Sequence, residues 1–355
     1  TVVVDRWGGT ELNRLTVGGN LEVLDGAALD IRAAETNATM LWGGEIDVDG
    51  DFTIGTGSYV RLWCDILNLG APHVTVGGAF TVAAGGEVSA DRRGGAPGHQ
   101  TATWAPRLGP RTVGYGYGAG TKTGASHGGL GGRGYQSYSD TFYSATPPPP
   151  LVDDEWTAAY PGAGGFADGY GEGGIGGGLV YVEARGPVTV DGTISADGAF
   201  GSYSGLGAAN TNSPYCTYFA SGAGGGIHLK GASFGGNGRI SARGGNSIAG
   251  YADAGNVYGY ASGTGGGGRV AVIVGADDEA THEEVFSYRS TSAQDERIAQ
   301  RVTFAGIIDV GAGTNVWSKA SKTTPPVQFV QSYGGVGTVR YVRLQPPTGT
   351  VILLK

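Results

Sequence analysis

Hydrophobic and polar residues alternate one by one through much of this chain. Typical runs are RLTVGGNLEVL (14–24), GEIDVDGDFTIG (44–55), YVRLWCDILNL (59–69) and LVYVEARGPVTVDGTISA (179–196). A period of two residues is typical of β-strands that bury one face, and the spacing of amphipathic helices is nearly absent. The runs are short and separated by GG, DG or GN, dipeptides that enter tight corners at little conformational cost. The pattern predicts an all-β protein.

A longer repeat is superimposed on the strands. Three segments, EVSAD (87–91), TISAD (193–197) and RISAR (239–243), share an apolar residue, Ser-Ala and a charged residue. A glycine-rich insert follows each of them, and a strand follows each insert. The inserts have very different lengths and span about 92–178, 198–226 and 244–268. Constant strand phrases with variable inserts at one corner are typical of a solenoid, in which each coil stacks on the previous one.

Each insert ends in a glycine run: GIGGG (174–178), GAGGG (222–226) and GTGGGG (263–268). Neighbouring β-strands lie only about 4.8 Å apart. We therefore expect glycine at the corner where an insert rejoins the stack, because it lets two backbones approach closely. The alternative is that each run is a flexible linker. A linker does not explain why an apolar strand follows every run, or why Ser-Ala precedes every insert.

The glycine spacing also carries a resemblance to a known family. SHGGLGGRGYQ (126–136) and GGIGGGLVYVEARGPVTVDGTISADG (173–198) resemble the glycine-rich parallel β-helix segments of large secreted and surface proteins. The style is similar to that of pectate-lyase-like solenoids, and the resemblance covers roughly residues 75–275. It implies a right-handed parallel β-helix. It concerns the fold only, because the acidic metal-binding triad of pectate lyases has no recognisable counterpart here.

The composition of the sequence changes near residue 276. GADDEATHEEVF (275–286) concentrates acidic residues, and Pro325-Pro326 and Pro346-Pro347 punctuate the strand-like runs that follow. A solenoid exposes its apolar end unless another segment covers it. We therefore expect a β-solenoid over residues 1–275, with a long Gly/Tyr-rich insert at about 92–178, and a C-terminal cap or small β-domain over 276–355.

Composition limits the cellular locations and the classes of partner that we expect for this protein. Glycine makes up 71 of 355 residues and only 15% of residues are charged, so small polar residues and tyrosine must cover much of the surface. The net charge of −8 offers no basic face to nucleic acid, and no apolar run is long enough to predict a membrane span. Few cysteines and lysines favour an extracellular or cell-surface protein. We expect Cys64 either as a buried apolar residue or in a disulfide with Cys216.

The inserts carry most of the aromatic residues. Fourteen of the 18 tyrosines lie between residues 115 and 260. If the inserts leave from one corner, their rings form one ridge or cleft, and flat rings with polar tips could hold a saccharide there. The same rings could instead pack on each other or on a second subunit. The candidate residues for a saccharide or subunit contact are Trp104, Tyr135, Tyr138 and Trp156.

Candidate catalytic residues are few. Asp91 and Asp197 occupy equivalent positions of the repeat, where adjacent coils would bring together the two carboxylates that glycoside hydrolysis requires. The third equivalent position is Arg243, so a structural Asp–Arg pair between coils is the simpler explanation. A lyase needs a base beside an arginine that binds the substrate. Residues of these types, without a diagnostic spacing, are Arg92, Arg93, His99, His127 and Arg133.

Calcium is the only cofactor that the sequence suggests. DVDGD (47–51) begins like an acidic calcium loop, but the glycine and glutamate of an EF-hand are missing from its sixth and twelfth positions. Asp47, Asp49 and Asp51 could still share a structural calcium ion. The simpler explanation is that alternate strand residues face water.

Two classes of function follow from these features. The first is an extracellular structural protein that assembles with copies of itself into a filament, sheath or adhesive layer. Low charge, a glycine- and tyrosine-rich surface and the weakness of every catalytic motif favour it. The second is a secreted polysaccharide lyase, glycoside hydrolase or carbohydrate-binding β-helix, which the aromatic inserts and the usual functions of the fold favour. We favour the first class, in which the protein is not an enzyme, and keep the second as the alternative.

Overall fold

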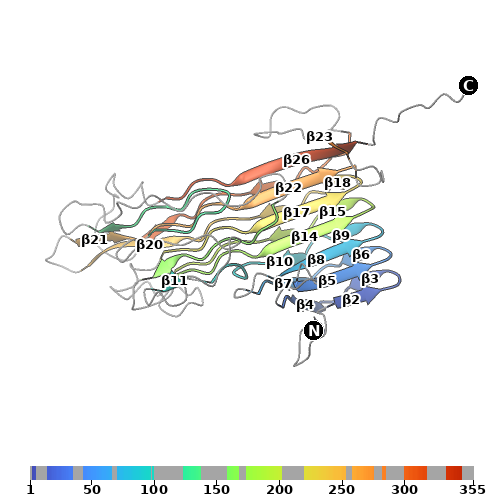
Figure 1. The fold of residues 1–355 in the computed structure, drawn as a ribbon, viewed down its shortest axis with the longest axis horizontal. Helices are drawn as coiled ribbons and strands as arrows, with labels where there is room; N and C mark the ends of the chain where they lie inside the picture. The colour runs from blue at the N-terminus through green and yellow to red at the C-terminus, as the bar shows by residue number, and fades with distance from the viewer. Residues whose placement is uncertain are drawn as a thin grey trace, which may run out of the picture.

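A computed structural model shows a stack of β-strands extended sideways by long glycine-rich segments (Figure 1). The structure describes residues 2–4, 14–34, 43–65, 70–96, 98–99, 123–136, 158–167, 173–201, 220–252, 258–275, 282–284, 300–317 and 333–345. The regular structure in these ranges consists of strands, and the predicted all-β fold is confirmed. In this part of the chain, no helix is long and apolar enough to cross a membrane.

Three parallel sheets carry the architecture. Sheet A contains β1 (Val2–Val4), β4 (Ala28–Arg32), β7 (Tyr59–Trp63), β10 (Glu87–Ser89), β16 (Thr193–Ser195), β19 (Arg239–Ser241) and β24 (Ile307–Asp309). Sheet B contains β2 (Arg14–Val17), β5 (Gly43–Val48), β8 (Ala71–Val76), β14 (Leu179–Ala184), β17 (Gly226–Gly231), β22 (Arg269–Val274), β26 (Thr338–Gln345) and the antiparallel β23 (His282–Glu284). Sheet C contains β3 (Leu21–Val23), β6 (Phe52–Ile54), β9 (Phe80–Val82), β15 (Val188–Val190) and β18 (Phe234–Gly235).

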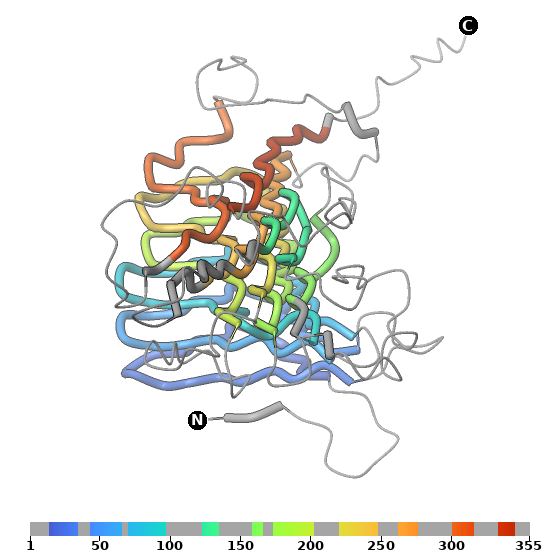
Figure 2. Tube along the Cα trace, turned by 90° about the vertical axis from the view of Figure 1, so that its left-hand side faces the viewer, coloured from blue at the N-terminus to red at the C-terminus, as the bar shows by residue number. Residues whose placement is uncertain are grey.

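The chain passes through the three sheets in a fixed order. Each complete coil runs from sheet B through sheet C to sheet A, and the next coil adds one parallel strand to each sheet. Figure 2 shows the coils stacked in chain order, from blue at the bottom to red at the top. The Ser-Ala phrases occupy equivalent places, since Ser89 pairs with Ser195 and Ser195 with Ser241. This architecture is consistent with a parallel β-solenoid.

The inward faces of the three sheets form one apolar core. In β8, Val74 and Val76 are buried, whereas Thr75 between them is exposed. Phe52 and Phe80 pair in register in sheet C, with ring centroids 5.5 Å apart. Because a slip of one residue would turn the apolar side chains outward, the alternation has to be kept in every coil.

A second core, built largely of backbone, lies beside the sheets. Its extended segments lead away from sheet A and return to sheet B (Figure 1). We call it the glycine bundle; it consists of residues 94–96, 123–133, 160–165, 173–178, 196–201, 220–225, 242–246, 262–268, 310–314 and 333–337. Most of the residues in these ranges are buried. The glycine runs are therefore long packed segments, instead of the flexible linkers considered above, and they extend well beyond a corner.

The segment that precedes β22 shows how the bundle is bonded. The N–H groups of Gly265 and Gly268 both donate to segment 242–246, at 3.0 and 2.7 Å. The two N–H groups between them donate to segments 123–133 and 333–337. A polyproline II helix has three residues per turn and no internal hydrogen bonds, so its backbone groups point to neighbours on several sides. In this segment the hydrogen bonds return to the same neighbour at every third residue. This period fits packed polyproline II helices, whereas strands of a flat sheet would bond to two neighbours only.

Glycine is needed in the bundle because neighbouring backbones leave no room for a side chain. A Cβ atom built on Gly266 would lie 2.1 Å from the carbonyl oxygen of Gly129. One built on Gly225 would lie 1.9 Å from that of Gly178. Favourable contacts between carbon atoms begin near ~3.5 Å. Alanine at these positions would therefore force two segments apart.

The first insert reaches coils far from its own. Residues 123–133 follow β10 in the sequence, yet Gly129 N donates to Gly267 O and Gly132 N to Thr264 O, both at 2.8 Å. The insert also folds back on itself, since Gly124 N donates to Gly132 O at 2.7 Å. A single insert thus contributes segments of the glycine bundle that are hydrogen-bonded to several later coils.

Short strands mark the far end of the bundle, where the inserts continue. β20 (Ser247–Ala252) and β21 (Tyr258–Ala261) pair antiparallel, with β12 (Tyr135–Gln136) beside β21 and β25 (Asn315–Trp317) beside β20. β11 (Gly98–His99) pairs with β13 (Phe166–Ala167). Figure 1 places β11, β20 and β21 at the same end, opposite the three sheets.

The chain after residue 275 adds to the stack. β24 extends sheet A and β26 extends sheet B, both in parallel register. β23 then pairs antiparallel with β26 at the edge of sheet B. The described part of 276–355 therefore supplies further strands together with a cover for one sheet edge.

Substituting Gly266→Ala is expected to lower the free energy of unfolding by about 3 kcal/mol, because the new methyl group would overlap the Gly129 carbonyl group. Gly19→Ala is the matched control, since nothing lies within 4 Å of the Cβ position of Gly19. We expect it to change stability by about 0.5 kcal/mol or less. Urea unfolding of both variants measures the difference, and equal stabilities would contradict the close packing of the bundle.

Candidate functional site

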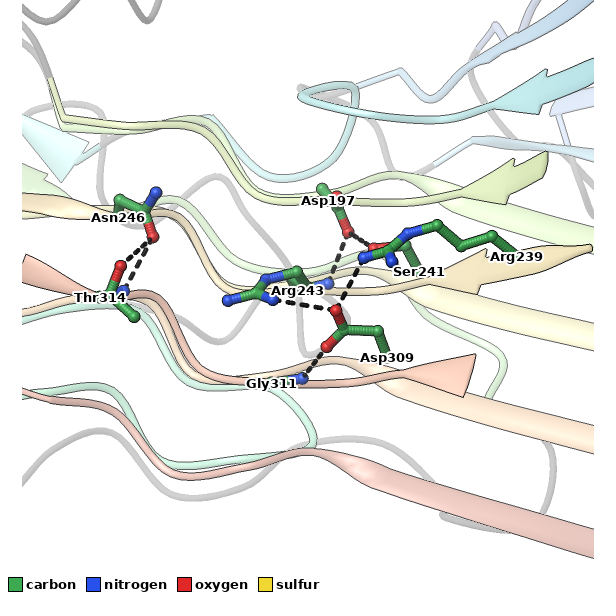
Figure 3. A network of polar contacts seen from close by, with 8 residues as sticks. All are labelled: Asp197, Arg239, Ser241, Arg243, Asn246, Asp309, Gly311 and Thr314. Atoms are coloured by element: carbon green, nitrogen blue, oxygen red, sulfur yellow. Dashed lines mark hydrogen bonds and ion pairs between the residues drawn. The ribbon is translucent and has the colours of Figure 1, made fainter. Parts of the chain in front are cut away.

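The aspartates of the repeated phrase hold neighbouring coils together; Figure 3 shows the contacts of Asp197. Asp91 accepts a hydrogen bond from Asp197 N at 2.6 Å, and Asp197 accepts one from Arg243 N at 2.6 Å. The Ser241 hydroxyl donates to the same oxygen of Asp197 at 2.7 Å. Burial raises the pKa of Asp197, although these two hydrogen bonds oppose the rise. The two candidate catalytic carboxylates thus lie on adjacent coils, where each binds a backbone N–H of the next coil.

The Asp–Arg pair between coils involves a different aspartate from the one expected. Asp309 Oδ2 lies 2.9 Å from Nη1 of Arg243 and 2.8 Å from Nη2 of Arg239. Asp309 occupies the place of Ser241 in the next coil. Arg243 therefore binds Asp197 through its backbone N–H and directs its guanidinium group to the following coil, as Figure 3 shows.

His127 and Arg133 lie in different surroundings. The His127 side chain is buried, and its Nδ1 lies 2.8 Å from Gly224 O. Because a carbonyl oxygen only accepts, Nδ1 is the donor, and the ring does what a backbone N–H does elsewhere in the bundle. Arg133 is exposed near the end of the same segment.

The predicted aromatic contact residues lie mostly outside the described part of the chain. Trp104, Tyr138 and Trp156 are among the residues that the structure does not describe. His99 and Tyr135 belong to β11 and β12, of which only the backbone is described. The saccharide or subunit contact therefore stays a prediction.

Asp47 and Asp51 of DVDGD are bound to different partners, and Asp49 is exposed. Asp47 Oδ2 accepts a hydrogen bond from Arg14 Nε at 2.8 Å, and Asp51 Oδ1 accepts one from Ala79 N at 2.7 Å. Among the residues that the structure describes, no three His, Cys, Asp or Glu side chains are grouped to hold a metal ion. The contacts of Asp47 and Asp51 are links between coils.

Cys64 is a free thiol, and Cys216 lies outside the described residues. Cys64 packs beside Ala71, Leu179 and Tyr181. Burial raises the pKa of its thiol to about 12. Since the thiolate is the reactive form, this cysteine is inert at neutral pH.

A group of ionisable side chains that the sequence analysis did not select lies on the outer face of sheet B. His73, Tyr181 and His228 pair in register on the adjacent strands β8, β14 and β17. The Tyr181 ring stacks on His228, with centroids 3.9 Å apart, and meets His73 edge-on at 4.8 Å. Together with Glu183 and Lys230, two residues further along their strands, they form what we call the sheet B cluster.

Glu183 is the centre of charge in the sheet B cluster. Its carboxylate oxygens lie 3.8 Å from Nε2 of His228, 3.8 Å from Nε2 of His73 and 3.4 Å from Nζ of Lys230. The two imidazoles that face the carboxylate hold the pKa of Glu183 well below its usual range. The effect of His228 is the larger of the two and that of His73 comes second. Burial and the adjacent Glu183 charge raise the pKa of Tyr181. At neutral pH the cluster therefore combines a carboxylate with a neutral phenol.

Solvent reaches one side of the sheet B cluster. The side chains of Glu183 and Lys230 are 30% and 32% exposed, whereas that of His228 is 2% exposed. A ligand would therefore meet the carboxylate and the ammonium group, with the rings held beneath them. Carboxylate, imidazole and phenol are the usual groups of acid–base chemistry, so the arrangement is able to bind polar ligands or transfer protons.

The residues of this cluster can be recognised in the sequence only after the strand phrases of successive coils are aligned with each other. The strand phrases HVTV, LVYVEA and GIHLK each carry one ring residue at the same distance from the corner. Placing the three rings in one column requires the register between coils. Inserts of unequal length separate the phrases, so spacing along the chain does not reveal it.

Comparison with known proteins identifies no relative: no family model, curated protein or solved structure matches the chain. The chemistry of the sheet B cluster and of the inter-coil aspartates is therefore interpreted from their geometry alone.

Glu183→Gln is expected to lower the free energy of unfolding by about 1–2 kcal/mol at pH 7, because it removes the charge that the imidazoles and Lys230 stabilise. A carboxylate with a lowered folded-state pKa stabilises above its unfolded pKa, and that stability is lost as the pH falls. The difference from the unsubstituted protein should therefore shrink below the ordinary glutamate pKa of about 4.3.

Thermal unfolding at several pH values measures this effect. Glu22→Gln removes the same charge from an exposed position of β3 and should leave the stability profile unchanged. A difference for Glu183→Gln that stays constant from neutral to acidic pH would contradict the electrostatic role of Glu183.

Proposed function

We propose that this protein is an extracellular structural subunit, a right-handed β-helix that assembles with copies of itself into a filament, sheath or adhesive layer. Two rigid cores support the proposal. Side chains fill the space between the three sheets, and backbone hydrogen bonds fill the glycine bundle. Asp91 and Asp197, the catalytic candidates from the sequence, form hydrogen bonds between coils.

The observation that carries the proposal is the outermost segment of the glycine bundle. All residues of segment 262–268 are buried, whereas none of segment 333–337 is. Val336 is 69% exposed, and the neighbouring Leu130 and Tyr333 are 43% and 40% exposed. An inner segment bonds to neighbours on several sides, so an outer one presents backbone groups that a segment of another copy can pair with. The edge of a β-sheet promotes association in the same way.

Substituting Val336→Lys is expected to raise the concentration needed for assembly about tenfold or more, because an unpaired ammonium group would enter the contact between copies. Ile307→Lys is the matched control, since Ile307 is 60% exposed but lies on sheet A. Electron microscopy and sedimentation of the purified protein measure assembly. A protein that stays monomeric at high concentration, or equal effects of the two substitutions, would contradict the proposal.

The sheet B cluster favours a second candidate function, a secreted polysaccharide lyase or glycoside hydrolase, or a carbohydrate-binding β-helix. Glu183 and Lys230 are partly exposed above a row of aromatic and imidazole rings. A carboxylate and an ammonium group of this kind are able to bind sugar hydroxyl groups, and a carboxylate that stays ionised is able to stabilise positive charge that develops on a sugar ring.

If this second function holds, the protein should release reducing or unsaturated ends from a polysaccharide, and Glu183→Gln should reduce the rate at least about a hundredfold. The assay is done well below the unfolding temperature of the variant, with Glu22→Gln as the control of equal charge. Release that persists in Glu183→Gln would show that the sheet B cluster is not the source of the activity.

A further inference from the structure

Two arginines flank the indole ring of Trp63 on the outer face of sheet A. Trp63 ends β7, which lies between β4 and β10. The Cζ atom of Arg32, from the coil on one side, is 5.3 Å from the ring centroid. That of Arg93, from the coil on the other side, is 4.3 Å from it. A cation at these distances from an indole ring is attracted to its π-face, and Arg is the cation that most often takes this place.

Two buried donors in this arrangement have no acceptor among the residues that the structure describes. Nε1 of Trp63 and Nε of Arg93 are both buried without a hydrogen-bond partner. Arg93 uses Nη1 to donate to the backbone and side-chain oxygens of Ser89, at 3.2 and 3.1 Å. Buried donors are nearly always paired in native proteins, so an unpaired couple calls for an acceptor.

The charge of Arg93 is not matched by a direct counterion within the described part of the chain. Among the residues that the structure describes, Arg93 forms no ion pair within contact distance. The nearest acids have other partners: Asp30 pairs with Arg61, and Asp91 accepts from Asp197 N. Burial lowers the pKa of Arg93, which reflects the cost of a cation held away from water.

We propose that Arg93, Trp63 and Arg32 form a binding site for an oxyanion, the carboxylate or sulfate group of an acidic polysaccharide. A planar guanidinium edge matches the geometry of such groups, and the indole N–H adds a neutral donor. Arg32 is exposed and brings a second cation to the solvent side of the ring. The site goes beyond the proposed self-assembly, because a single copy is sufficient for binding.

Isothermal titration calorimetry with four probes tests the site: polygalacturonate oligosaccharides, dextran sulfate, inorganic sulfate and neutral dextran. The chain carries a net charge of −8, so unspecific adsorption of a polyanion is disfavoured. We expect polygalacturonate or dextran sulfate to bind and neutral dextran not to bind. Inorganic sulfate should bind much more weakly, because a polymer presents many acidic groups to the site at a high effective concentration.

Arg93→Gln should weaken binding about tenfold or more, as expected for the loss of a charge-assisted hydrogen bond. Arg92→Gln is the matched control: Arg92 is the adjacent residue and exposed, and its loss changes the net charge equally. It should change affinity less than about twofold. Trp63→Phe keeps an aromatic ring without the N–H group and should weaken binding by a smaller factor than Arg93→Gln. If Arg93→Gln does not fold, Arg93→Lys keeps the charge without the planar edge and should still bind more weakly.

Three results would overturn the inference. The first is that no acidic probe binds. The second is that Arg92→Gln weakens binding as much as Arg93→Gln, which would indicate diffuse electrostatic attraction. The third is that inorganic sulfate binds as tightly as the polymers, which would indicate a site for a small free anion. None of these results bears on assembly, so a failure of this site and a failure of the proposed function are distinguishable.

Discussion

Backbone hydrogen bonding between chain segments that lie too close for side chains is the constraint on which this structure depends. In the glycine bundle the nearest carbonyl oxygen would often be about 2 Å from a Cβ atom, as at Gly225 and Gly266. Such a contact exists only if both segments stay free of side chains at the crossing. The sheets beside the bundle obey the same spacing, but their side chains alternate into the core and into solvent. The same coil therefore changes from a side-chain core to a backbone core as it leaves sheet A.

This change of packing separates the structural and chemical parts of the molecule. In the bundle many backbone N–H groups donate to a neighbouring segment, and even the buried His127 ring serves as a donor to a backbone carbonyl group. The outer faces of the sheets are less constrained, because one side chain per two residues points outward in every coil. Columns of side chains arise there, such as the rings of the sheet B cluster and the arginines around Trp63.

The outcome for the candidate site residues follows from the same geometry. Asp91 and Asp197 were recognisable as equivalent because their phrases repeat, and the structure places them on adjacent coils. Their partners were not predictable, since a carboxylate at that position can face a side chain or the backbone N–H of the next coil. His73 and His228 gave no signal in the linear sequence. They flank the same Tyr181 and Glu183 only because two inserts of different length end at the same register.

The sequence by itself determined the strands, their inward and outward faces and the stacking of coils, because alternation and the repeated Ser-Ala phrase depend on local pattern and on burial of one face. It also marked the glycine runs as places of close approach. Only the tertiary structure decided that these runs form a bundle and which segments they contact. Glycine is compatible with a turn, a linker or a packed helix alike, so its role is set by the neighbours that the fold brings to it. The same holds for the two outer columns, because their members come from coils whose register no single stretch of sequence contains.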